Sequence, residues 1–300
     1  MKPITLLLFL FPVIHELRAQ VSDSIQLSNA SLCYEIKGEG LPVLLLSGGP
    51  GVSSQQLVRL RDSISQKFKS ILFDQRGTGQ SRSFPLDSTT INLKQSVQDI
   101  ATLLKELKIN KVTIIGHSWG AMLAVSFAIE YPSQINKLVL IDSGPLAFSD
   151  YEIQASNVYA RASKVEKEYM DRLEDSMKTS PSRALGMARA KQFLRFITYD
   201  ATKTDSLFEE ICKGGSSPVM SMLMFQDLQK TNYNVKNRIG SIKFPTLVIC
   251  GRQDPIGIFP SIYLKELNNN INLIWIEKSG HYPWLEQPAA FFPELFKFLK

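Results

Sequence analysis

A serine flanked by glycines is the first feature of this chain that could do chemistry. Residues 112–115 are apolar, the motif Gly-x-Ser-x-Gly covers residues 116–120, and an alanine-rich helical pattern follows at once. In this setting the motif presents a nucleophile at the apex of a strained turn, with glycine where a Cβ would not fit. A turn that is merely rich in small residues is the alternative. The apolar run before the motif and the helix after it favour Ser118 as a nucleophile.

A nucleophilic serine needs a base, and histidine commonly serves. The chain contains three histidines, one of them in the first twenty residues. His117 directly precedes the serine, so its side chain should point away from that of Ser118. His281 is therefore the predicted base, which takes the Ser118 proton and returns it to the leaving group. A capped surface histidine in a glycine-rich loop is the alternative interpretation of His281.

An acid must orient the histidine and stabilise its charged form. Asp254 is the predicted acid because it lies in a Gly-x-x-Asp turn directly after the apolar run 245–250. Asp142 is the rival, because it also ends an apolar run, although it could instead cap the loop that follows. Ser118, Asp254 and His281 come in the order nucleophile, acid and histidine, which is one of the known orders of a catalytic triad.

An oxyanion hole needs two backbone N–H groups that point at the developing charge. Trp119, immediately after the nucleophile, should supply one of them. The second should come from the glycine-rich loop 47–51, with Gly49 as the best candidate. An ordinary flexible turn is the alternative for this loop. It is not a phosphate loop, because no Gly-Lys-Ser/Thr follows.

The candidate residues follow short apolar runs that alternate with helical patterns. Such alternation predicts an α/β fold, in which a mostly parallel central sheet has helices on both faces. Ligands of these sheets bind beyond the carboxyl ends of the strands, so the candidates should meet at one edge. The predicted strands of this sheet cover residues 42–46, 71–73, 112–115, 135–141, 245–250 and 272–276.

The alternation stops near Pro145 and resumes near residue 238. Between these points we find no good strand, and the helical patterns cover residues 151–177, 181–197 and 206–213. The sequence therefore predicts a core made of residues 20–144 and 238–300, with a helical cap, residues 145–237, inserted between its two parts.

The first nineteen residues differ in kind from the rest. Lys2 precedes an apolar run over residues 4–14, and Ala19 supplies a small residue after it. This pattern is typical of a secretory signal peptide and predicts cleavage after Ala19, with export to the periplasm or the medium. An anchored or buried N-terminal helix is the alternative. The run is shorter than the ~20 residues that span a bilayer, so no stable membrane insertion is expected once the signal is removed.

Charge and cysteine content exclude several classes of function. The net charge is +6, but the basic residues are scattered singly, which predicts a solvated surface and no nucleic-acid partner. The three cysteines have neither metal nor redox spacing. We therefore expect no cofactor and no metal, and a small peptide or small molecule as the substrate. The sequence does not define an oligomeric state.

The motifs together resemble the α/β-hydrolases, and among them the proline iminopeptidase (prolyl aminopeptidase) family. That family shows His-Gly-Gly-Pro-Gly, Asp-Gln-Arg-Gly-x-Gly-x-Ser, a Gly-x-Ser-Trp-Gly elbow, Gly-x-x-Asp and a late Gly-His. The corresponding segments of this chain are residues 47–51, 74–81, 116–120, 251–254 and 280–281. The resemblance covers nearly all of the chain after the signal except the cap. It implies a serine peptidase that releases N-terminal residues, proline above all, from short peptides.

Two departures from the family concern substrate binding. Ser47 stands where the family has histidine. The family binds the free amine of its substrate with cap glutamates near tryptophans, whereas residues 145–237 contain no tryptophan. Glu209 and Glu210 are the candidate amine ligands that the resemblance suggests. A solvated helix face is the alternative for these two carboxylates.

Three functions follow as hypotheses. The first is an aminopeptidase, for which a buried cap carboxylate would be the mark. The second is a carboxylesterase or another small-molecule hydrolase, favoured by an apolar cap. The third is a binding protein without catalysis, which the presence of all three triad residue types disfavours. Dehalogenase and epoxide hydrolase chemistry would need an aspartate in place of Ser118.

Overall fold

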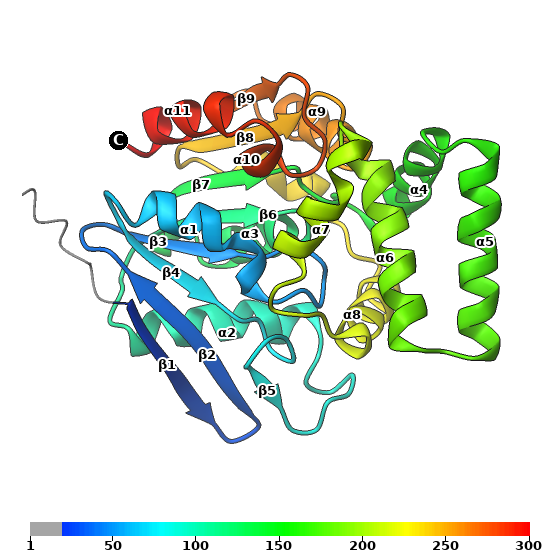
Figure 1. Ribbon diagram of the computed structural model, residues 1–300. Helices are drawn as coiled ribbons and strands as arrows, with labels where there is room; N and C mark the ends of the chain where they lie inside the picture. The colour runs from blue at the N-terminus through cyan, green and yellow to red at the C-terminus, as the bar shows by residue number, and fades with distance from the viewer. Residues whose placement is uncertain (1–19) are drawn as a thin grey trace, which may run out of the picture.

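The structure is a computed structural model, and it describes residues 20–300. The predicted signal peptide, residues 1–19, lies outside the described residues. A single twisted sheet runs through the molecule in the order β1-β2-β4-β3-β6-β7-β8-β9, and β5 pairs with β2 (Figure 1). The strands are β1 Gln20–Leu27, β2 Ala30–Lys37, β3 Pro42–Leu46, β4 Lys69–Phe73, β5 Arg82–Ser83, β6 Val112–His117, β7 Ile135–Ile141, β8 Thr246–Gly251 and β9 Ile271–Ile276.

The strands from β4 to β9 in this order run parallel to one another, whereas β2 pairs antiparallel with β1, β4 and β5. Every residue of β6 and of β8 is buried. Strands covered on both faces have continuous apolar sequences rather than alternating ones, which explains the unbroken runs in this chain. The predicted fold class is confirmed.

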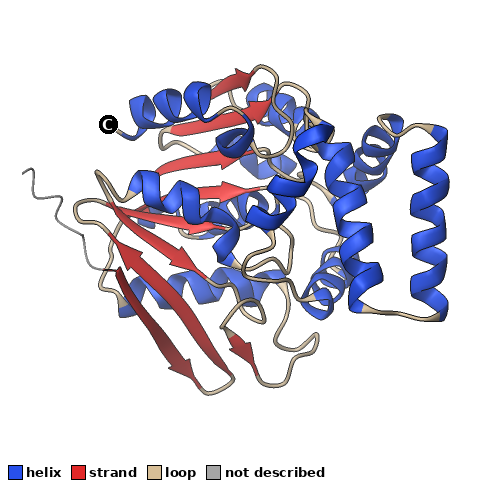
Figure 2. Ribbon diagram, viewed as in Figure 1, coloured by secondary structure: helices blue, strands red, loops and turns tan. Residues whose placement is uncertain are grey.

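Helices cover both faces of the sheet (Figure 2). On one face α2, α3 and α9 pack against side chains such as Leu44 and Leu46. On the other face α1 and α11 pack against Val43 and Leu45. The alternate residues of β3 therefore serve opposite cores, as the period of two in a strand requires. The helices of the core are α1 Val58–Ile64, α2 Leu93–Glu106, α3 Trp119–Glu130, α9 Ile258–Leu267, α10 Pro283–Glu286 and α11 Pro288–Leu299.

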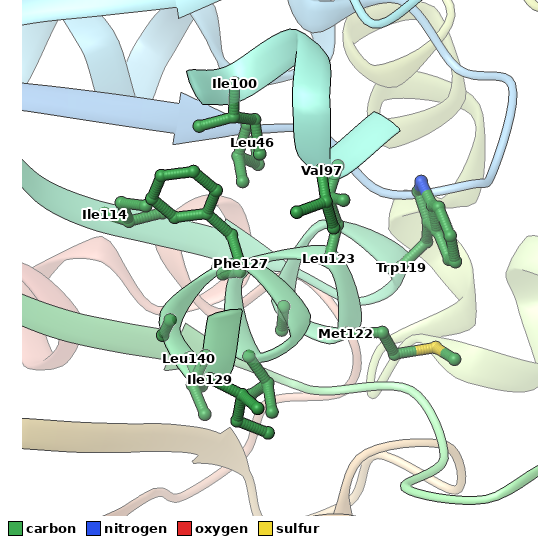
Figure 3. Close-up of a cluster of buried hydrophobic side chains, with 14 of the residues drawn as sticks. Leu46, Val97, Ile100, Ile114, Trp119, Met122, Leu123, Phe127, Ile129 and Leu140 are labelled. Atoms are coloured by element: carbon green, nitrogen blue, oxygen red, sulfur yellow. The ribbon is translucent and has the colours of Figure 1, made fainter. Parts of the chain in front are cut away.

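Helix α3 lies at the centre of the larger core (Figure 3). Its side chains from Trp119 to Ile129 are almost all buried, and its first half packs on Leu46 and Leu140 of the sheet. A helix that is apolar on every side is stable only when it is enclosed. The helix that begins at Ser118 therefore gives the serine a rigid base.

The segment between β7 and β8 is helical and projects from the sheet on the side of the strand ends (Figure 1). Its helices are α4 Tyr151–Ala160, α5 Lys164–Thr179, α6 Arg183–Ile197, α7 Thr204–Ile211 and α8 Pro218–Lys230. The pattern over 151–177 predicted one helix, but the structure has two. The chain breaks before α5 because Ser163 and Glu166 form a capping box that starts a new helix.

Two smaller details of the core also differ from the sequence prediction. A 3-10 turn, which the apolar pattern does not predict, precedes α1 at the place where Asp74 accepts the N–H of Ser54 and the hydroxyl of Ser53. The two-residue strand β5 is too short to leave a pattern. The 3-10 helices are η1 Ser54–Leu57, η2 Pro132–Gln134, η3 Phe148–Asp150, η4 Ala201–Lys203 and η5 Lys236–Ser241.

A search of the described helices finds none with the length and apolarity that a membrane crossing requires.

A buried ion pair between Arg76 and Asp99 joins the loop after β4 to α2. Arg76 Nε and Nη2 donate to the two oxygens of Asp99 at 2.8 and 2.6 Å, and both side chains are almost wholly enclosed. Removal of one partner leaves an uncompensated buried charge. We expect Asp99→Ala to lower the free energy of unfolding by about 3–5 kcal/mol in urea titrations.

The exposed pair Lys191–Asp205 is the control for this prediction. Asp205→Ala should leave the unfolding midpoint within about 0.5 kcal/mol of the wild type, as exposed pairs contribute little. Equal effects of the two substitutions would contradict the importance assigned to the buried pair.

Candidate active site

Ser118 occupies a strained turn between β6 and α3. Its φ of 54° and ψ of −117° are rare for a residue with a side chain. A Cβ on Gly116 would overlap the carbonyl of Gly120, and a Cβ on Gly120 would overlap the carbonyl of Leu46. The two glycines of the motif therefore allow strand, turn and helix to approach closely. The turn is fixed from the neighbouring strand, since Ser118 N–H donates to Ile141 O at 3.0 Å.

His281 and Asp254 form a buried hydrogen-bonded pair. The Nδ1 of His281 lies 2.8 Å from Asp254 Oδ2, and the two side chains are 3% and 0% exposed. Asp254 also accepts the N–H groups of Ile256 and Gly257, at 2.9 and 2.7 Å. The carboxylate is thus held rigidly by the turn after β8. It fixes His281 with Nε2 free to act on a substrate or nucleophile.

His117 links the serine turn to the histidine loop. Its Nε2–H donates to the backbone carbonyl of His281 at 2.9 Å, and the two rings lie 4.7 Å apart. Burial and the neighbouring His281 lower the pKa of His117 well below its ordinary value. His117 is therefore neutral, and its side chain points to the loop of His281, away from the nucleophile.

Ser118 itself is partly exposed, and within the described residues its Oγ has no hydrogen-bond partner. Catalytic hydrogen bonds are often long or absent before substrate binds. Ser118 follows β6 and His281 follows β9, so both lie at the same edge of the sheet, with β7 and β8 between their strands, and the bond from His117 to the carbonyl of His281 joins the two segments.

The two expected oxyanion donors are Gly49, in the loop after β3, and Trp119, in the turn after β6. The side chain of Gln75 connects these two segments. Gln75 accepts from the indole Nε1–H of Trp119 at 2.7 Å and donates to the carbonyl of Ser47 at 3.0 Å. Gly48 N–H is occupied by Gln56 Oε1 at 2.9 Å, whereas neither Gly49 N–H nor Trp119 N–H has an acceptor among the described residues. This arrangement leaves those two donors free to bind an oxyanion.

The motif over residues 74–81 is the scaffold of this bridge. Asp74 Oδ2 accepts Gln80 N–H at 2.9 Å, which closes the motif into a compact loop around Gln75. Gly79 has a positive φ of 50°, and a Cβ there would overlap the Asp74 carboxylate. The motif thus holds the amide of Gln75 between the two oxyanion loops.

The cap is tied directly to the glycine-rich loop. Ser217 N–H donates to Gly51 O at 2.8 Å, and Ser53 N–H donates to Gly215 O at 3.2 Å. The hydroxyl of Ser221 donates to Pro50 O. The start of α8 and the loop after β3 therefore form one packed unit.

The rival acid, Asp142, is buried at the end of β7, and its Oδ1 accepts Gly251 N–H at 2.9 Å. The imidazole bonds Asp254 and not Asp142. Asp142, Cys250 and Asp254 are also the one group of side chains in the described residues with the proximity to hold a metal ion. An ion there would compete with His281 for Asp254, so the cluster is better explained by the histidine.

The structure does not support Glu209 and Glu210 as amine ligands. Glu209 is exposed to solvent, and Glu210 pairs with Lys213 at 2.8 Å and with Arg59 at 4.0 Å. A carboxylate in water, or one already neutralised, gains little from a substrate ammonium. These contacts do not single out either carboxylate as an amine ligand, so the suggestion stays a prediction.

Sequence reasoning missed Glu286, which supports the histidine loop. Its carboxylate accepts the N–H groups of Gly280, Tyr282 and Tyr199 at 3.0, 3.2 and 2.7 Å. Burial raises the pKa of Glu286. The chain before His281 is also fixed to the cap, since His281 N–H donates to Ile197 O at 2.8 Å. The only sequence signal was an acidic residue in the short helix after the histidine.

Comparison with known proteins identifies the class to which this fold and site belong. Residues 42–288 match the family described as alpha/beta hydrolase fold, so the chain belongs to that family. Among solved structures, an alpha/beta fold family hydrolase from Bacillus anthracis str. Sterne superposes with a TM-score of 0.76, at 19% identity over 93% of this chain and 99% of that chain.

Proteins with similar sequences include proline iminopeptidases and other hydrolases. The protein named proline iminopeptidase in Heyndrickxia coagulans is 26% identical over 272 residues, which cover 89% of this chain and 93% of that protein. The AB hydrolase superfamily protein YclE of Bacillus subtilis (strain 168) is also 26% identical, over 273 residues, which cover 87% of this chain and 92% of that protein. The resemblance to proline iminopeptidases seen in the motifs is thus confirmed.

The three hydrogen bonds that Glu286 accepts suggest a test of whether this residue positions the loop of His281. Glu286→Gln keeps the size of the side chain but turns one acceptor into a donor, which must face a backbone N–H. We expect kcat/KM for any turned-over ester to fall by up to about 100-fold, as small shifts of a catalytic group cost that much.

Glu277→Gln is the matched control, since Glu277 is an exposed carboxylate of the same segment and pairs with Arg252. Its kcat/KM should stay within about twofold of the wild type. A Glu286→Gln enzyme as active as this control would show that the loop needs no such anchor.

Proposed function

We propose that this protein is a serine hydrolase in which Ser118, His281 and Asp254 form the catalytic triad. The observation that carries the proposal is the buried pair of His281 and Asp254 beside a serine in a strained turn. Membership of the alpha/beta hydrolase family supports it. Neither a metal nor a cofactor is needed for this chemistry.

The mechanism follows from the geometry. His281 Nε2 takes the Ser118 proton as Oγ attacks a carbonyl carbon, and Asp254 holds the imidazole through Nδ1 while it is charged. The N–H groups of Gly49 and Trp119 bind the oxyanion. His281 then protonates the leaving group, and a water molecule, activated in the same way, releases the acid and restores Ser118.

The charge distribution of the cap favours a substrate without an ammonium group. Asp150 is the one buried carboxylate of residues 145–237, and Lys236 Nζ neutralises it at 2.7 Å. A free amine desolvated in a pocket needs a carboxylate partner. No such unpaired, buried carboxylate is present in the cap.

Aromatic side chains line the cap above the start of α3. Phe148, Tyr151 and Phe225 pack with ring centroids 5.2–5.5 Å apart, and Tyr151 Oη lies 3.8 Å from the sulfur of Met122, one turn after Ser118. An apolar wall of this kind suits an acyl or alkyl chain. We therefore propose a small carboxylic ester as the preferred substrate.

Release of an N-terminal residue from short peptides is the second candidate. The relative named proline iminopeptidase, which is 26% identical over most of both chains, favours it. In this case the substrate's amine would be bound through backbone carbonyls or water, in place of a cap carboxylate.

A substrate panel separates the two candidates. It contains nitrophenyl acetate and butyrate, prolyl and alanyl arylamides, and the N-acetylated arylamides. We expect the esters to be turned over and the free and N-acetylated arylamides to differ by less than about threefold in kcat/KM, because the cap offers no charge that would select the free amine. Cleavage of free arylamides with loss on acetylation would instead establish the second candidate.

Ser118→Ala should lower kcat on every active substrate by roughly 10⁴-fold or more. Ser126→Ala is the matched control, since Ser126 lies on α3, the helix that Ser118 precedes, and its hydroxyl donates to Met122 O. Full activity of Ser118→Ala would overturn both candidates.

We also propose export of the mature chain to the periplasm or the medium. The signal-like sequence of residues 1–19 supports it. Expression of the full chain with a C-terminal tag should give an exported protein that begins at Gln20, read by N-terminal sequencing. An intact N-terminus in the cytosolic fraction would contradict the proposal.

A further inference from the structure

Two carboxyl groups lie side by side behind the imidazole of His281. Asp142 follows β7 and Asp254 follows β8, which are neighbouring parallel strands. Both side chains are 0% exposed, and an oxygen of each lies within 4.8 Å of the other and of Cys250 Sγ. Gly257 packs on both residues, because a Cβ there would overlap Asp254 Oδ2 and lie 2.8 Å from Asp142 Cα. The pair is therefore fixed in close contact.

The two carboxyl groups have unequal numbers of donors. Asp254 accepts from Ile256 N–H, Gly257 N–H and His281 Nδ1. Asp142 accepts one N–H on Oδ1, while its Oδ2 is buried without any partner in the described residues. An ionised carboxylate with an unpaired buried oxygen is expensive, whereas a protonated one needs only an acceptor. Asp254 provides that acceptor.

We propose that Asp142 carries a proton on Oδ2 and donates it to the carboxylate of Asp254, so that Asp142 is a positioning residue for the triad. The proposal rests on the function proposed above, in which Asp254 is the acid of the triad. Asp142 touches neither the substrate nor the reacting atoms. It acts through Asp254, whose orientation and charge it sets.

Electrostatics support this distribution of charge. Two adjacent buried carboxyls cannot both ionise at low cost, so one of them retains its proton. Burial and the charge of Asp254 raise the pKa of Asp142 well above its ordinary value. Asp254, with three donors, keeps the negative charge.

The other groups that face the pair add no competing positive charge. Burial and the two aspartates raise the pKa of Cys250, and burial raises that of Tyr282, so both stay neutral in the assay range. Glu286 faces Asp254 from α10, and its carboxylate is bonded by three backbone N–H groups. Neutral His117 faces His281 from β6.

The donated hydrogen bond has a consequence for the pH dependence of catalysis. It draws negative charge from Asp254 and so weakens the hold of Asp254 on a protonated His281. Without the bond the imidazolium is held more tightly, so it loses its proton to give the neutral imidazole base only at higher pH. The acid limb of kcat/KM, which reports the base in the free enzyme, then moves to higher pH.

Two substitutions of Asp142 distinguish two hypotheses. In one, Asp142 is protonated and donates a hydrogen bond to Asp254. In the other, Asp142 is ionised. Asp142→Asn keeps a neutral donor toward Asp254 and an acceptor for Gly251, and asparagine tolerates the φ of 44° at this position. Asp142→Gly removes the donor without backbone strain. We expect Asp142→Asn to retain kcat/KM within about threefold, and Asp142→Gly to lose about 10- to 100-fold with the acid limb raised by about 0.5–1 pH unit.

Ser118→Ala and Asp254→Asn are the controls, each measured on the ester that the wild type hydrolyses best. Full activity of Ser118→Ala would remove the proposed function itself. If Ser118→Ala is inactive but Asp142→Asn falls as far as Asp254→Asn, about 10⁴-fold, Asp142 is an ionised acid and the present proposal is overturned. An unshifted acid limb in a folded Asp142→Gly, checked by thermal melting, would overturn it as well.

Infrared spectroscopy gives a measurement that does not depend on activity. The difference spectrum of wild type minus Asp142→Asn at pH 8 should contain the C=O stretch of a protonated carboxylic acid, absent from the difference between wild type and Asp205→Asn. Carboxylate bands alone in the first spectrum would overturn the proposal.

Discussion

The amide of Gln75 is the interaction on which the geometry of this site depends. An oxyanion hole in this fold needs N–H groups from two loops that are more than sixty residues apart, one after β3 and one after β6. Gln75 spans them with one donated and one accepted hydrogen bond, to Ser47 O and from Trp119 Nε1. An amide can make both bonds at once, because its nitrogen donates while its oxygen accepts. Asp74 and Arg76, on either side, hold the amide in place through their own buried bonds.

His281 is also positioned by hydrogen bonds, which come from several parts of the chain. Asp254 binds the ring, His117 binds the carbonyl, Glu286 binds the flanking N–H groups, and Ile197 of the cap accepts the N–H of His281. These contacts come from the core strands, the C-terminal helices and the cap. A loop with so many fixed hydrogen bonds loses little entropy when the reaction begins, which is the physical meaning of a preorganised site.

Much of this arrangement could be predicted from sequence because it depends on local rules. Strands buried on both faces leave continuous apolar runs, and the candidate residues follow those runs, so the sheet, Ser118, Asp254 and His281 could be placed at one edge. Contacts between distant segments leave no such trace. Glu286 and the bond from His117 are recognised only when the loops are seen together. Helical periodicity likewise does not say whether Glu209 and Glu210 meet solvent or substrate, because it does not fix which face of a cap helix is covered.

The bonds from Ser217 and Ser221 to the loop after β3 bear on how such enzymes diversify. In this chain the cap shares backbone hydrogen bonds with the loop that carries Gly49, one of the two proposed oxyanion donors. A recombinant that exchanges residues 145–237 alone would break that shared unit. A chimera of two homologues should therefore take residues 47–53 and residues 215–221 from the same parent, so that the hydrogen bonds between the two segments are preserved.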